Sequence, residues 1–456
     1  HVMNVDNNTF VTFICLVSAM GGLLFGYDWV VIGGAKPFYE LFFGISADPV
    51  MQGVAMSTAL VGCLVGAMVA GGMADRYGRK PLLIISAVLF TLSAVATGAV
   101  SDFTLFNIAR FIGGVGIGVA SALSPMYIAE ISPAQVRGRL VSLNQMTIVL
   151  GILGAQIVNW QLAEPVPAGY TDADIVTSWN GQMGWRWMFW AEALPAVAFL
   201  VLSFLIPESP RWQMLHGREN RALATLTRIG GAGYARSEAE AMRGATPDET
   251  AGSGGIATLF SRRYAPVLVL GIFIAVFQQW CGTNVIFNYA QEIFSAAGYS
   301  VGDVLFNIVI TGVANVVFTV VAIYTVDRWG RRSLMLFGAG GLGVVYLILG
   351  TCYHLHVTGF FMVVLVVAAI ACYAMSLGPV TWVLLSEIFP TRVRGVAMAT
   401  CTFALWTGCT TLTFSFPSLN ASLGSSGTFW LYSVICFAGL LFFIRRLPET
   451  KGKRLE

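Results

Sequence analysis

Twelve apolar runs, each long enough to cross a lipid bilayer, follow one another along this chain of 456 residues. Spanning the hydrocarbon core takes about 20 apolar residues. Lipid offers the backbone no hydrogen-bond partner, so each run must be helical. The runs lie at residues 9–34, 50–71, 81–101, 104–124, 139–160, 187–206, 264–295, 304–326, 333–352, 358–386, 395–418 and 427–446. The sequence therefore predicts an all-α membrane protein with twelve transmembrane helices.

The composition excludes most other classes of protein. Hydrophobic residues make up 56% of the chain and charged residues 11%, whereas a soluble domain carries about 25% charged residues. So little polar surface cannot cover so much apolar side chain in one globule. A net charge of +3 is far too small for a nucleic-acid binder. We expect a lipid bilayer as the environment and no nucleic-acid partner.

The distribution of basic residues predicts the orientation. Lys36 and Arg186 fall in loops on one side and Arg110 falls within a span, whereas the other Lys and Arg residues fall in alternate loops on the opposite side. The positive-inside rule places that opposite side in the cytoplasm. Both termini are then cytoplasmic. The first apolar run has no basic segment before it, so we read it as the first span and not as a signal peptide.

One long connector divides the chain. Residues 207–263 hold 14 charged residues, the segment around 218–228 has the pattern of a short amphipathic helix, and 245–255 have the composition of a flexible linker. We therefore expect an N-terminal six-helix half at 1–206, a cytoplasmic helical linker at 207–263, and at 264–456 a C-terminal six-helix half with a short tail.

The two halves carry the same motifs in the same order. These are D-R-x-G-R at 75–79 and 327–331, x-E-I-x-P at 129–133 and 386–390 with R-G at 137–138 and 394–395, and P-E at 207–208 and 448–449. Ordered pairs at similar spacing indicate a duplicated bundle. Many secondary transporters build their site between such repeats.

These motifs resemble the major facilitator superfamily and, within it, the sugar porter family. The residues that carry the resemblance are the two D-R-x-G-R loops, P-E-S-P-R-W at 207–212, Q-Q-W-C-G-T-N at 278–284 and P-E-T-K-G at 448–452. The resemblance is strongest to bacterial sugar–proton symporters of the xylose type, and some features are shared with animal glucose facilitators. It implies alternating-access import of a monosaccharide together with protons, by a monomer in a bacterial inner membrane.

Three ionisable residues within or near spans are candidates for proton coupling. Asp28 and Arg110 have opposite charge and belong to the same half, so we expect them to meet; Glu192 lies in the sixth span. A charge at mid-membrane is costly unless it is paired. The resemblance implies a proton-coupling role for all three, since symporters of this family have an Asp in the first span and an Arg in the fourth. The alternative is a static ion pair that only fixes helices.

Amide and aromatic side chains in the spans are candidates for sugar binding. Amides donate and accept hydrogen bonds, as sugar hydroxyls do, although a single amide in a span is equally able to join two helices. Gly282 and the Gly378-Pro379 pair are expected to break their helices and turn neighbouring side chains inward. With the resemblance, the predicted binding residues are Phe25, Gln145, Gln278, Gln279, Asn284, Asn288, Asn315, Trp382 and Trp406.

Three positions depart from the family pattern. Asn288 replaces a frequent Tyr, Leu405 replaces a Gln before the span-eleven Trp, and Ile152 replaces a Gln in the fifth span. Glucose, galactose, xylose and fructose therefore all remain open as substrates.

Charged residues at the predicted inner ends of the spans form a third group. They are Asp75, Arg76, Arg79, Glu130, Arg137, Asp327, Arg328, Arg331, Glu387 and Arg394. The resemblance implies a cytoplasmic gate of salt bridges between the halves; the alternative is a set of solvated charges that only follow the positive-inside pattern.

Two other functions remain open. One is a proton-independent facilitator (uniporter), in which the Asp28–Arg110 pair is structural. The other is a sugar sensor that does not transport; such sensors tend to carry long tails, whereas ten residues follow Arg446. The sequence contains no Walker motif, nucleophile triad or metal-ligand spacing, so we expect no enzyme activity, no metal and no cofactor.

Overall fold

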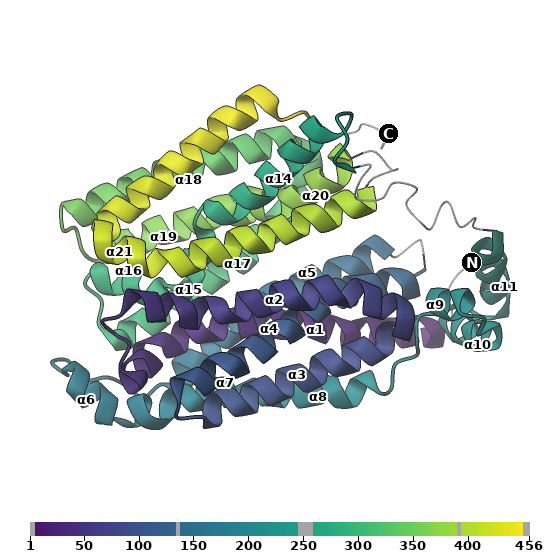
Figure 1. The fold of residues 1–456 in the computed structure, drawn as a ribbon, viewed down its shortest axis with the longest axis horizontal. Coiled ribbons are helices and arrows are strands. Elements are labelled where there is room, and N and C mark those ends of the chain that lie inside the picture. Colours follow the sequence, from purple (N-terminus) through teal and green to yellow (C-terminus); the bar gives the residue numbers. More distant parts are fainter. Residues whose placement is uncertain (1–4, 134–136, 245–258, 390–393, 450–456) are drawn as a thin grey trace. The chain divides into compact units, whose positions relative to one another are not determined.

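The computed structural model describes residues 5–133, 137–244, 259–389 and 394–449, and nearly all of them are helical (Figure 1). The elements up to the connector are α1 (Val5–Phe43), α2 (Pro49–Tyr77), α3 (Arg79–Ala99), α4 (Phe103–Ile131), α5 (Arg137–Leu162), α6 (Asp172–Thr177), η1 (Asn180–Gly184), α7 (Trp185–Ala191) and α8 (Ala193–Ser203). The connector forms α9 (Pro210–Leu215), α10 (Glu219–Gly230) and α11 (Ala232–Gly244). The remaining elements are α14 (Ala265–Trp280), α15 (Thr283–Asn288), α16 (Ala290–Ala296), α17 (Val301–Trp329), α18 (Arg331–His354), α19 (Phe360–Cys372), η2 (Tyr373–Leu377), α20 (Gly378–Ile388) and α21 (Arg394–Arg446).

The helices account for the twelve predicted spans. Among the described residues, ten helical stretches are long and apolar enough to cross a membrane. One of them, α21, contains two spans, because the backbone leaves helical geometry at Gly424 (φ 71°). The one span still to be accounted for is the fifth along the chain, α5. Its mean hydropathy is lowered by polar side chains such as Asn144, Gln145 and Gln156. The predicted all-α fold class is confirmed.

The chain forms two compact units. Unit 1 contains residues 1–31, 58–158 and 186–251, and unit 2 contains 32–57, 159–185 and 252–456. Helix α1 therefore contributes to both units, with Asp28 in unit 1 and Lys36 in unit 2. The division into sequence halves at 207–263 stays a prediction.

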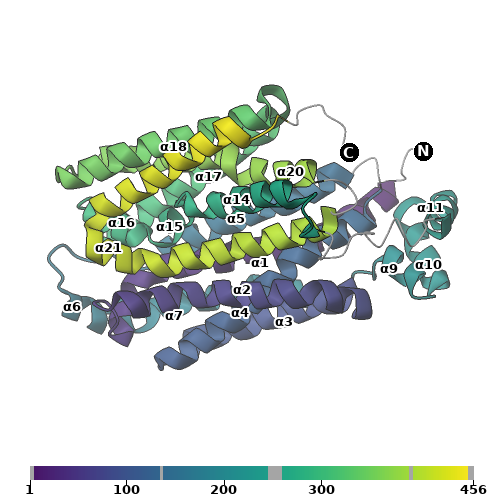
Figure 2. The same cartoon turned by 45° about the horizontal axis from the view of Figure 1, so that its top comes forward.

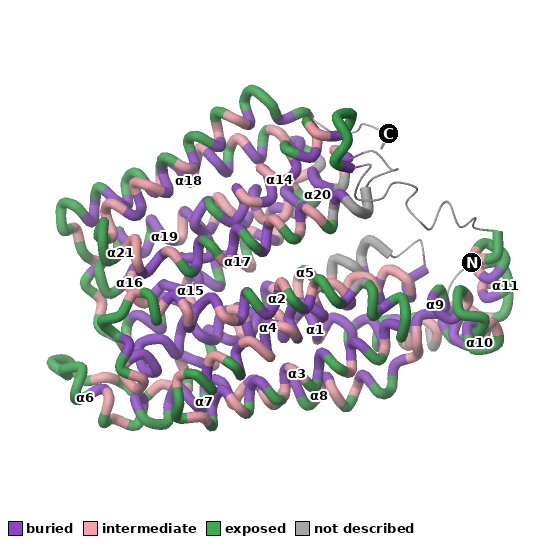
Figure 3. Tube along the Cα trace, viewed as in Figure 1, coloured by how far each residue is buried: buried purple, intermediate pink, exposed green. Residues whose placement is uncertain are grey.

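Unit 1 is held together by closely packed helices, with α3 against α4 and α8. Glycines allow the backbones to approach: a Cβ on Gly26 would collide with the carbonyl of Ile148, and one on Gly114 would collide with the carbonyl of Ala59. Small residues at helix contacts replace the hydrophobic effect, which lipid does not supply. The buried residues of α3 recur every three or four positions, so one face packs inward (Figure 3).

In unit 2, α21 packs against both α18 and α14 (Figure 2). The contact with α18 is fixed by a hydrogen bond from the Ser433 hydroxyl to the carbonyl of Gly343, at 2.7 Å. Gly338 and Gly343 of α18 lie at helix contacts, because a Cβ on Gly338 would meet the Ser376 side chain and one on Gly343 would meet the Phe437 ring.

The seventh span is interrupted where the sequence predicts, because Gly282 has φ 90° and separates α14 from α15. At the Gly378-Pro379 pair the tenth span changes from the π-helix η2 to α20 without leaving right-handed helical angles. In the sixth span a turn at Glu192 separates α7 from α8; the sequence analysis did not anticipate this local change.

The connector contains the predicted amphipathic helix, since α10 covers the segment around 218–228. It is attached to unit 1 by the Trp212 indole, which donates a hydrogen bond to the carbonyl of Asp75 at 2.9 Å. The predicted flexible linker at 245–255 lies outside the described residues.

Candidate functional site

A buried ion pair joins α1 to α4 in unit 1, as the sequence predicts. One Nη of Arg110 lies 3.1 Å from a carboxylate oxygen of Asp28, and the other donates to the Asp28 carbonyl at 3.2 Å. Both side chains are only 2% exposed. The guanidinium also lies 5.6 Å from the ring centroid of Phe189. Arg110 contacts only one of the two carboxylate oxygens of Asp28, and the Nε of Arg110 has no hydrogen-bond partner among the described residues.

Glu192 completes a set of three buried ionisable groups. Its side chain is 1% exposed and interacts electrostatically with both Asp28 and Arg110. The turn between α7 and α8 places its carboxyl there. The set contains two carboxyls and one guanidinium, so it is neutral only when one carboxyl carries a proton. Such a set is suited to holding and releasing a proton.

Predicted sugar-binding amides gather around the break at Gly282 in unit 2. Asn284 and Asn288 follow each other on α15, where the amide of Asn288 donates to the Asn284 side chain at 2.8 Å. Asn284 in turn donates to the Thr413 hydroxyl of α21. Both are buried, and the side-chain oxygen of Asn288 has no hydrogen-bond partner among the described residues.

Gln278 connects the two predicted helix breaks. From α14 it donates to the carbonyls of Leu377 and Gly378 at 3.0 and 2.8 Å. Its own oxygen accepts a hydrogen bond from Gln279 at 3.3 Å. Gln278 therefore joins helices in this structure, and its carbonyl oxygen faces the neighbouring amide.

The remaining predicted binding residues are dispersed over other helices. In unit 1, Phe25 of α1 lies 6.1 Å from the Trp29 ring, and Gln145 of α5 is exposed. In unit 2, Asn315 of α17 and Trp406 of α21 are buried, whereas Trp382 of α20 is 39% exposed. The structure does not bring these five residues together at one described site, so their role in sugar binding stays a prediction.

The three paired motifs meet at the ends of the helices. In unit 1, Arg79 donates to both carboxylate oxygens of Glu130, from Nε at 2.9 Å and from Nη2 at 2.8 Å. Its third nitrogen donates to the carbonyl of Ala74 at 2.9 Å. Asp75 lies 3.5 Å from Arg79, but its side chain is 80% exposed. Arg79 is thus almost saturated with partners.

Glu208 caps the helix that follows the first D-R-x-G-R motif. Its carboxylate accepts hydrogen bonds from the backbone N–H groups of Arg79 at 2.9 Å and Lys80 at 3.2 Å. Gly78 has φ 97°, and a Cβ there would meet this carboxylate. Burial raises the pKa of the Glu208 carboxyl above its ordinary value, an effect that its backbone N–H donors oppose.

Unit 2 repeats this arrangement. Arg331 donates to both oxygens of Glu387, at 3.2 and 2.9 Å, and Glu449 accepts from the backbone N–H of Arg331 at 3.1 Å. Gly330 has φ 83° and faces Glu449 as Gly78 faces Glu208. The same three motifs therefore build the same cluster twice, which is the structural form of the predicted duplication.

Other predicted gate residues are less informative. Arg76 and Arg328 are exposed, and Arg76 lies over the Tyr77 ring at 5.3 Å. The side chains of Arg137, Asp327 and Arg394 lie outside what the structure describes. The described salt bridges of this group join residues of one unit, so a gate between the halves stays a prediction.

Sequence reasoning missed one buried ionic cluster. Lys36 and Glu40 of α1 and Glu292 of α16 are in mutual contact within unit 2. The apolar run ends at residue 34, so Lys36 counted there as a basic residue of an outside loop. The structure corrects this, because α1 continues to Phe43 and Lys36 is fully buried.

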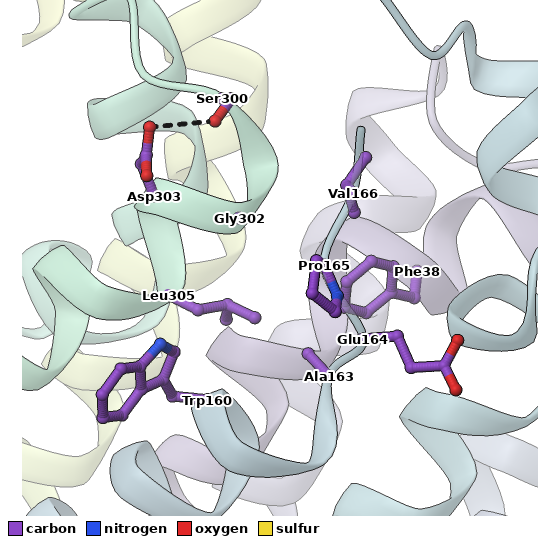
Figure 4. A pocket seen from close by; sticks show the side chains of 10 residues that line it. All are labelled: Phe38, Trp160, Ala163, Glu164, Pro165, Val166, Ser300, Gly302, Asp303 and Leu305. Atoms are coloured by element: carbon purple, nitrogen blue, oxygen red, sulfur yellow. Dashed lines mark hydrogen bonds between the residues drawn. The ribbon is translucent and has the colours of Figure 1, made fainter. Parts of the chain in front are cut away.

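A cavity of about 300 Å³ lies in unit 2 between the end of α5 and the start of α17 (Figure 4). Trp160 and Leu305 line it, and Ser300 donates to Asp303 at its rim, at 3.1 Å. It contains none of the predicted site residues, and we assign it no role in binding.

Comparisons with known proteins cover nearly the whole chain. The model of the family described as "Sugar (and other) transporter" matches residues 14–456. The D-xylose-proton symporter of Escherichia coli is 36% identical over 99% of this chain and 95% of its own length. The arabinose-proton symporter of Bacillus subtilis is 37% identical over 98% of this chain and 94% of its own.

Solved structures agree with these relatives. The xylose transporter XylE of Escherichia coli, in a partially occluded inward open conformation, has a TM-score of 0.85 at 35% identity and covers 98% of this chain and 100% of its own. The twelve-helix fold, the repeated motif clusters and these similarities agree, and they describe a multi-pass membrane transporter and not an enzyme. The chain belongs to the sugar transporter family of the major facilitator superfamily.

Proposed function

We propose that this protein imports a monosaccharide together with protons by alternating access. The observation that carries the proposal is the buried set of Asp28, Arg110 and Glu192, which has one more carboxyl than it has cations. Relatives at 36% and 37% identity bear the names xylose-proton and arabinose-proton symporter.

Asp28 is the proposed proton carrier. When Asp28 is ionised, its charge holds Arg110, and a buried charge is stable only while it is paired. Protonation removes that charge and releases the guanidinium, for which Glu192 is the nearby alternative partner. The cycle then has four steps: sugar binds, Asp28 takes up a proton, the halves rock so that sugar leaves inward, and Asp28 gives up the proton and pairs again.

The sugar is bound by amides and aromatic rings. Asn284 and Asn288 stand at a helix break, where α15 presents several polar groups close together. Together with Gln145, Gln278, Gln279 and Asn315 they offer donors and acceptors to the hydroxyls of one monosaccharide, and Phe25, Trp382 and Trp406 suit its apolar face. The substrate is a hexose or pentose such as glucose, galactose, xylose or fructose.

The paired motif clusters are proposed to act at the cytoplasmic side. Arg79–Glu130 and Arg331–Glu387 fix helix ends within each unit, and the exposed charges beside them, such as Asp75 and Arg76, are proposed to pair across the halves when the inner side closes. Exposed ion pairs are individually weak, and several together bias a two-state equilibrium. The protein is proposed to work as a monomer in a bacterial inner membrane, with both termini cytoplasmic.

The test is uptake of radiolabelled sugars into proteoliposomes, with and without an acid-outside gradient. The panel contains glucose, galactose, xylose and fructose. We expect one sugar to accumulate above equilibrium only when the gradient is present. Asp28→Asn abolishes this accumulation and keeps counterflow exchange, because exchange needs no net proton movement.

The matched control is Asp102→Asn, since Asp102 is an exposed acid just before the helix that carries Arg110. It leaves accumulation unchanged. Equilibration of sugar that does not depend on the gradient in the wild type would refute proton coupling and establish a facilitator. The proteins similar to this chain also include a facilitator, the glucose facilitated diffusion protein of Zymomonas mobilis, at 33% identity.

A further inference from the structure

A second buried ionic cluster lies on α1, eight residues beyond Asp28. The ammonium of Lys36 is fully buried and contacts the carboxylates of Glu40, one turn on, and of Glu292 on α16. The Glu40 side chain is 6% exposed and that of Glu292 21%. A fully buried lysine is among the most costly groups to place in a protein interior. Neither the family resemblance nor the predicted proton-coupling set includes it.

The cluster fixes the segment that carries the predicted sugar-binding amides. Lys36 lies 5.4 Å from the ring centroid of Tyr289, the residue between α15 and α16. The Tyr289 hydroxyl in turn donates to the carbonyl of Thr413 at 2.6 Å. Lys36 therefore holds α16 through Glu292 and α15 through the tyrosine that follows Asn288.

Helices α1 and α15 approach each other closely beside this cluster. A Cβ on Gly33 would lie 3.0 Å from the carbonyl oxygen of Phe287 and 3.3 Å from the Cα of Asn288. Only a residue without a side chain lets the backbone of α1 come this near to α15. The ionic contact and the close approach act on the same short segment, residues 287–292.

The cluster also borders open space. A cavity of about 450 Å³ in unit 2 is lined by Glu40, Gln291 and Glu292 together with residues of α2 and α21. The carboxylates of Glu40 and Glu292 therefore border a space that water can enter if Lys36 separates from them. Such a contact can open and close at a lower cost than one buried in a closed core.

We propose that Lys36 is a positioning residue for sugar transport, an ionic latch that holds α15 and α16 in the arrangement that binds sugar. By sequence, Lys36 belongs to the first half and Glu292 to the second, so the latch opens when alternating access moves this end of α1 relative to α16. The inference rests on the proposed function, since it assigns Asn284 and Asn288 to the sugar.

The first test measures the latch without any sugar. A cysteine is placed on α16 by Ala290→Cys, at a position 1% exposed, in a Cys372→Ser background, because the other seven native cysteines are buried. Labelling by a maleimide is timed in purified protein. We expect Lys36→Met to speed labelling at least fivefold and Lys36→Arg to leave it near the wild-type rate. Equal rates in all three would overturn the proposal, whether or not the protein transports sugar.

The second test separates positioning from stability. In proteoliposomes, Lys36→Met is expected to raise the KM for sugar about tenfold, the effect of losing a well-placed hydrogen bond, with a smaller change in the maximal rate. Lys36→Arg restores the KM. If Lys36→Met does not fold, Glu292→Gln, which keeps the side-chain shape, is measured in its place with the same expectation.

The matched control is Arg186→Met. Arg186 is another buried cation on the same predicted side, and it donates to the end of α3, to the carbonyls of Gly98 at 3.0 Å and Val100 at 2.7 Å and to the Ser101 hydroxyl at 3.2 Å. It is expected to lower stability and leave the KM unchanged. An equal rise of KM in Arg186→Met and Lys36→Met would overturn the positioning role. A wild type that transports no sugar refutes the proposed function, while the labelling rates still decide whether Lys36 is a latch.

Discussion

Two arginine–carboxylate pairs of unit 1, Arg79–Glu130 and Arg110–Asp28, differ in how completely their hydrogen-bonding groups are satisfied. Arg79 makes two hydrogen bonds to Glu130 and a third to a backbone carbonyl, near the ends of helices. Arg110 makes one hydrogen bond to the Asp28 carboxylate and one to its carbonyl, deep in the bundle. Both pairs use the same chemical groups, yet the more deeply buried pair is the less satisfied.

This difference indicates different uses. A bidentate pair with its lone pairs filled gives a fixed geometry, which suits a brace at helix ends. A pair in which the guanidinium contacts only one carboxylate oxygen and keeps a buried N–H without an acceptor is able to change partners, and Glu192 supplies the second carboxyl. The comparison therefore supports the proposed proton-carrying role of Asp28 and indicates a structural role for the Arg79 cluster.

The largest expected effect is that of Arg110→Met. This change leaves two carboxyls in the interior without a cation, and breaking a buried pair in this way costs about 3–5 kcal/mol. We expect a large drop in the denaturation midpoint of the purified protein and no gradient-driven accumulation. Adding Asp28→Asn to this variant removes one of the stranded charges and recovers part of the stability. Strictly additive losses in the double variant would contradict the pairing.

A smaller effect is expected from Arg79→Met. Hydrogen bonds to a charged group contribute about 1.5–3 kcal/mol, and this site is closer to water than Arg110. Arg331→Met should lose the same amount, because its cluster repeats the geometry of the first. Clearly unequal losses, measured by thermal unfolding of the two variants, would show that the two clusters are not equivalent.

The smallest effect on stability is expected from a change of Gly78, the glycine of the first D-R-x-G-R motif. Gly78→Ala places a side chain at φ 97° and ψ 171°, a region essentially restricted to glycine, which costs about 1–3 kcal/mol, and also pushes a Cβ against the Glu208 carboxylate. Gly44→Ala is the matched control, since Gly44 has φ 71° with nothing within 4 Å of the added Cβ. We expect Gly78→Ala to be the more destabilising of the two. Equal losses would show that contact with Glu208 contributes nothing.

Much of this fold follows from local signals in the sequence. The twelve spans are long apolar runs, and the break at Gly282 follows from a glycine between two polar residues of one span. The pairing of Asp28 with Arg110 follows because both are intramembrane charges of opposite sign in the same half. These predictions need only hydropathy, helix geometry and the cost of an isolated charge.

Other features depend on contacts that the sequence does not reveal. The paired motifs are visible as repeats, but Glu130 and Glu208 reach Arg79 only after four helices have packed. The burial of Lys36 could not be predicted because Lys36 follows the end of an apolar run, where a basic residue is usually solvated. Its burial depends on Glu292, 256 residues away. A Lys–Glu pair one turn apart just past an apolar run is the signal that points to such a site.

The most direct measurement of the central claim is proton movement itself. Proteoliposomes are suspended in a weakly buffered medium, the membrane potential is clamped with potassium and an ionophore, and the transported sugar is added while the external pH is recorded. The account predicts an alkaline shift of the medium in the wild type and in Asp102→Asn, and none in Asp28→Asn. Sugar entry into wild-type vesicles without any change of the external pH would contradict it.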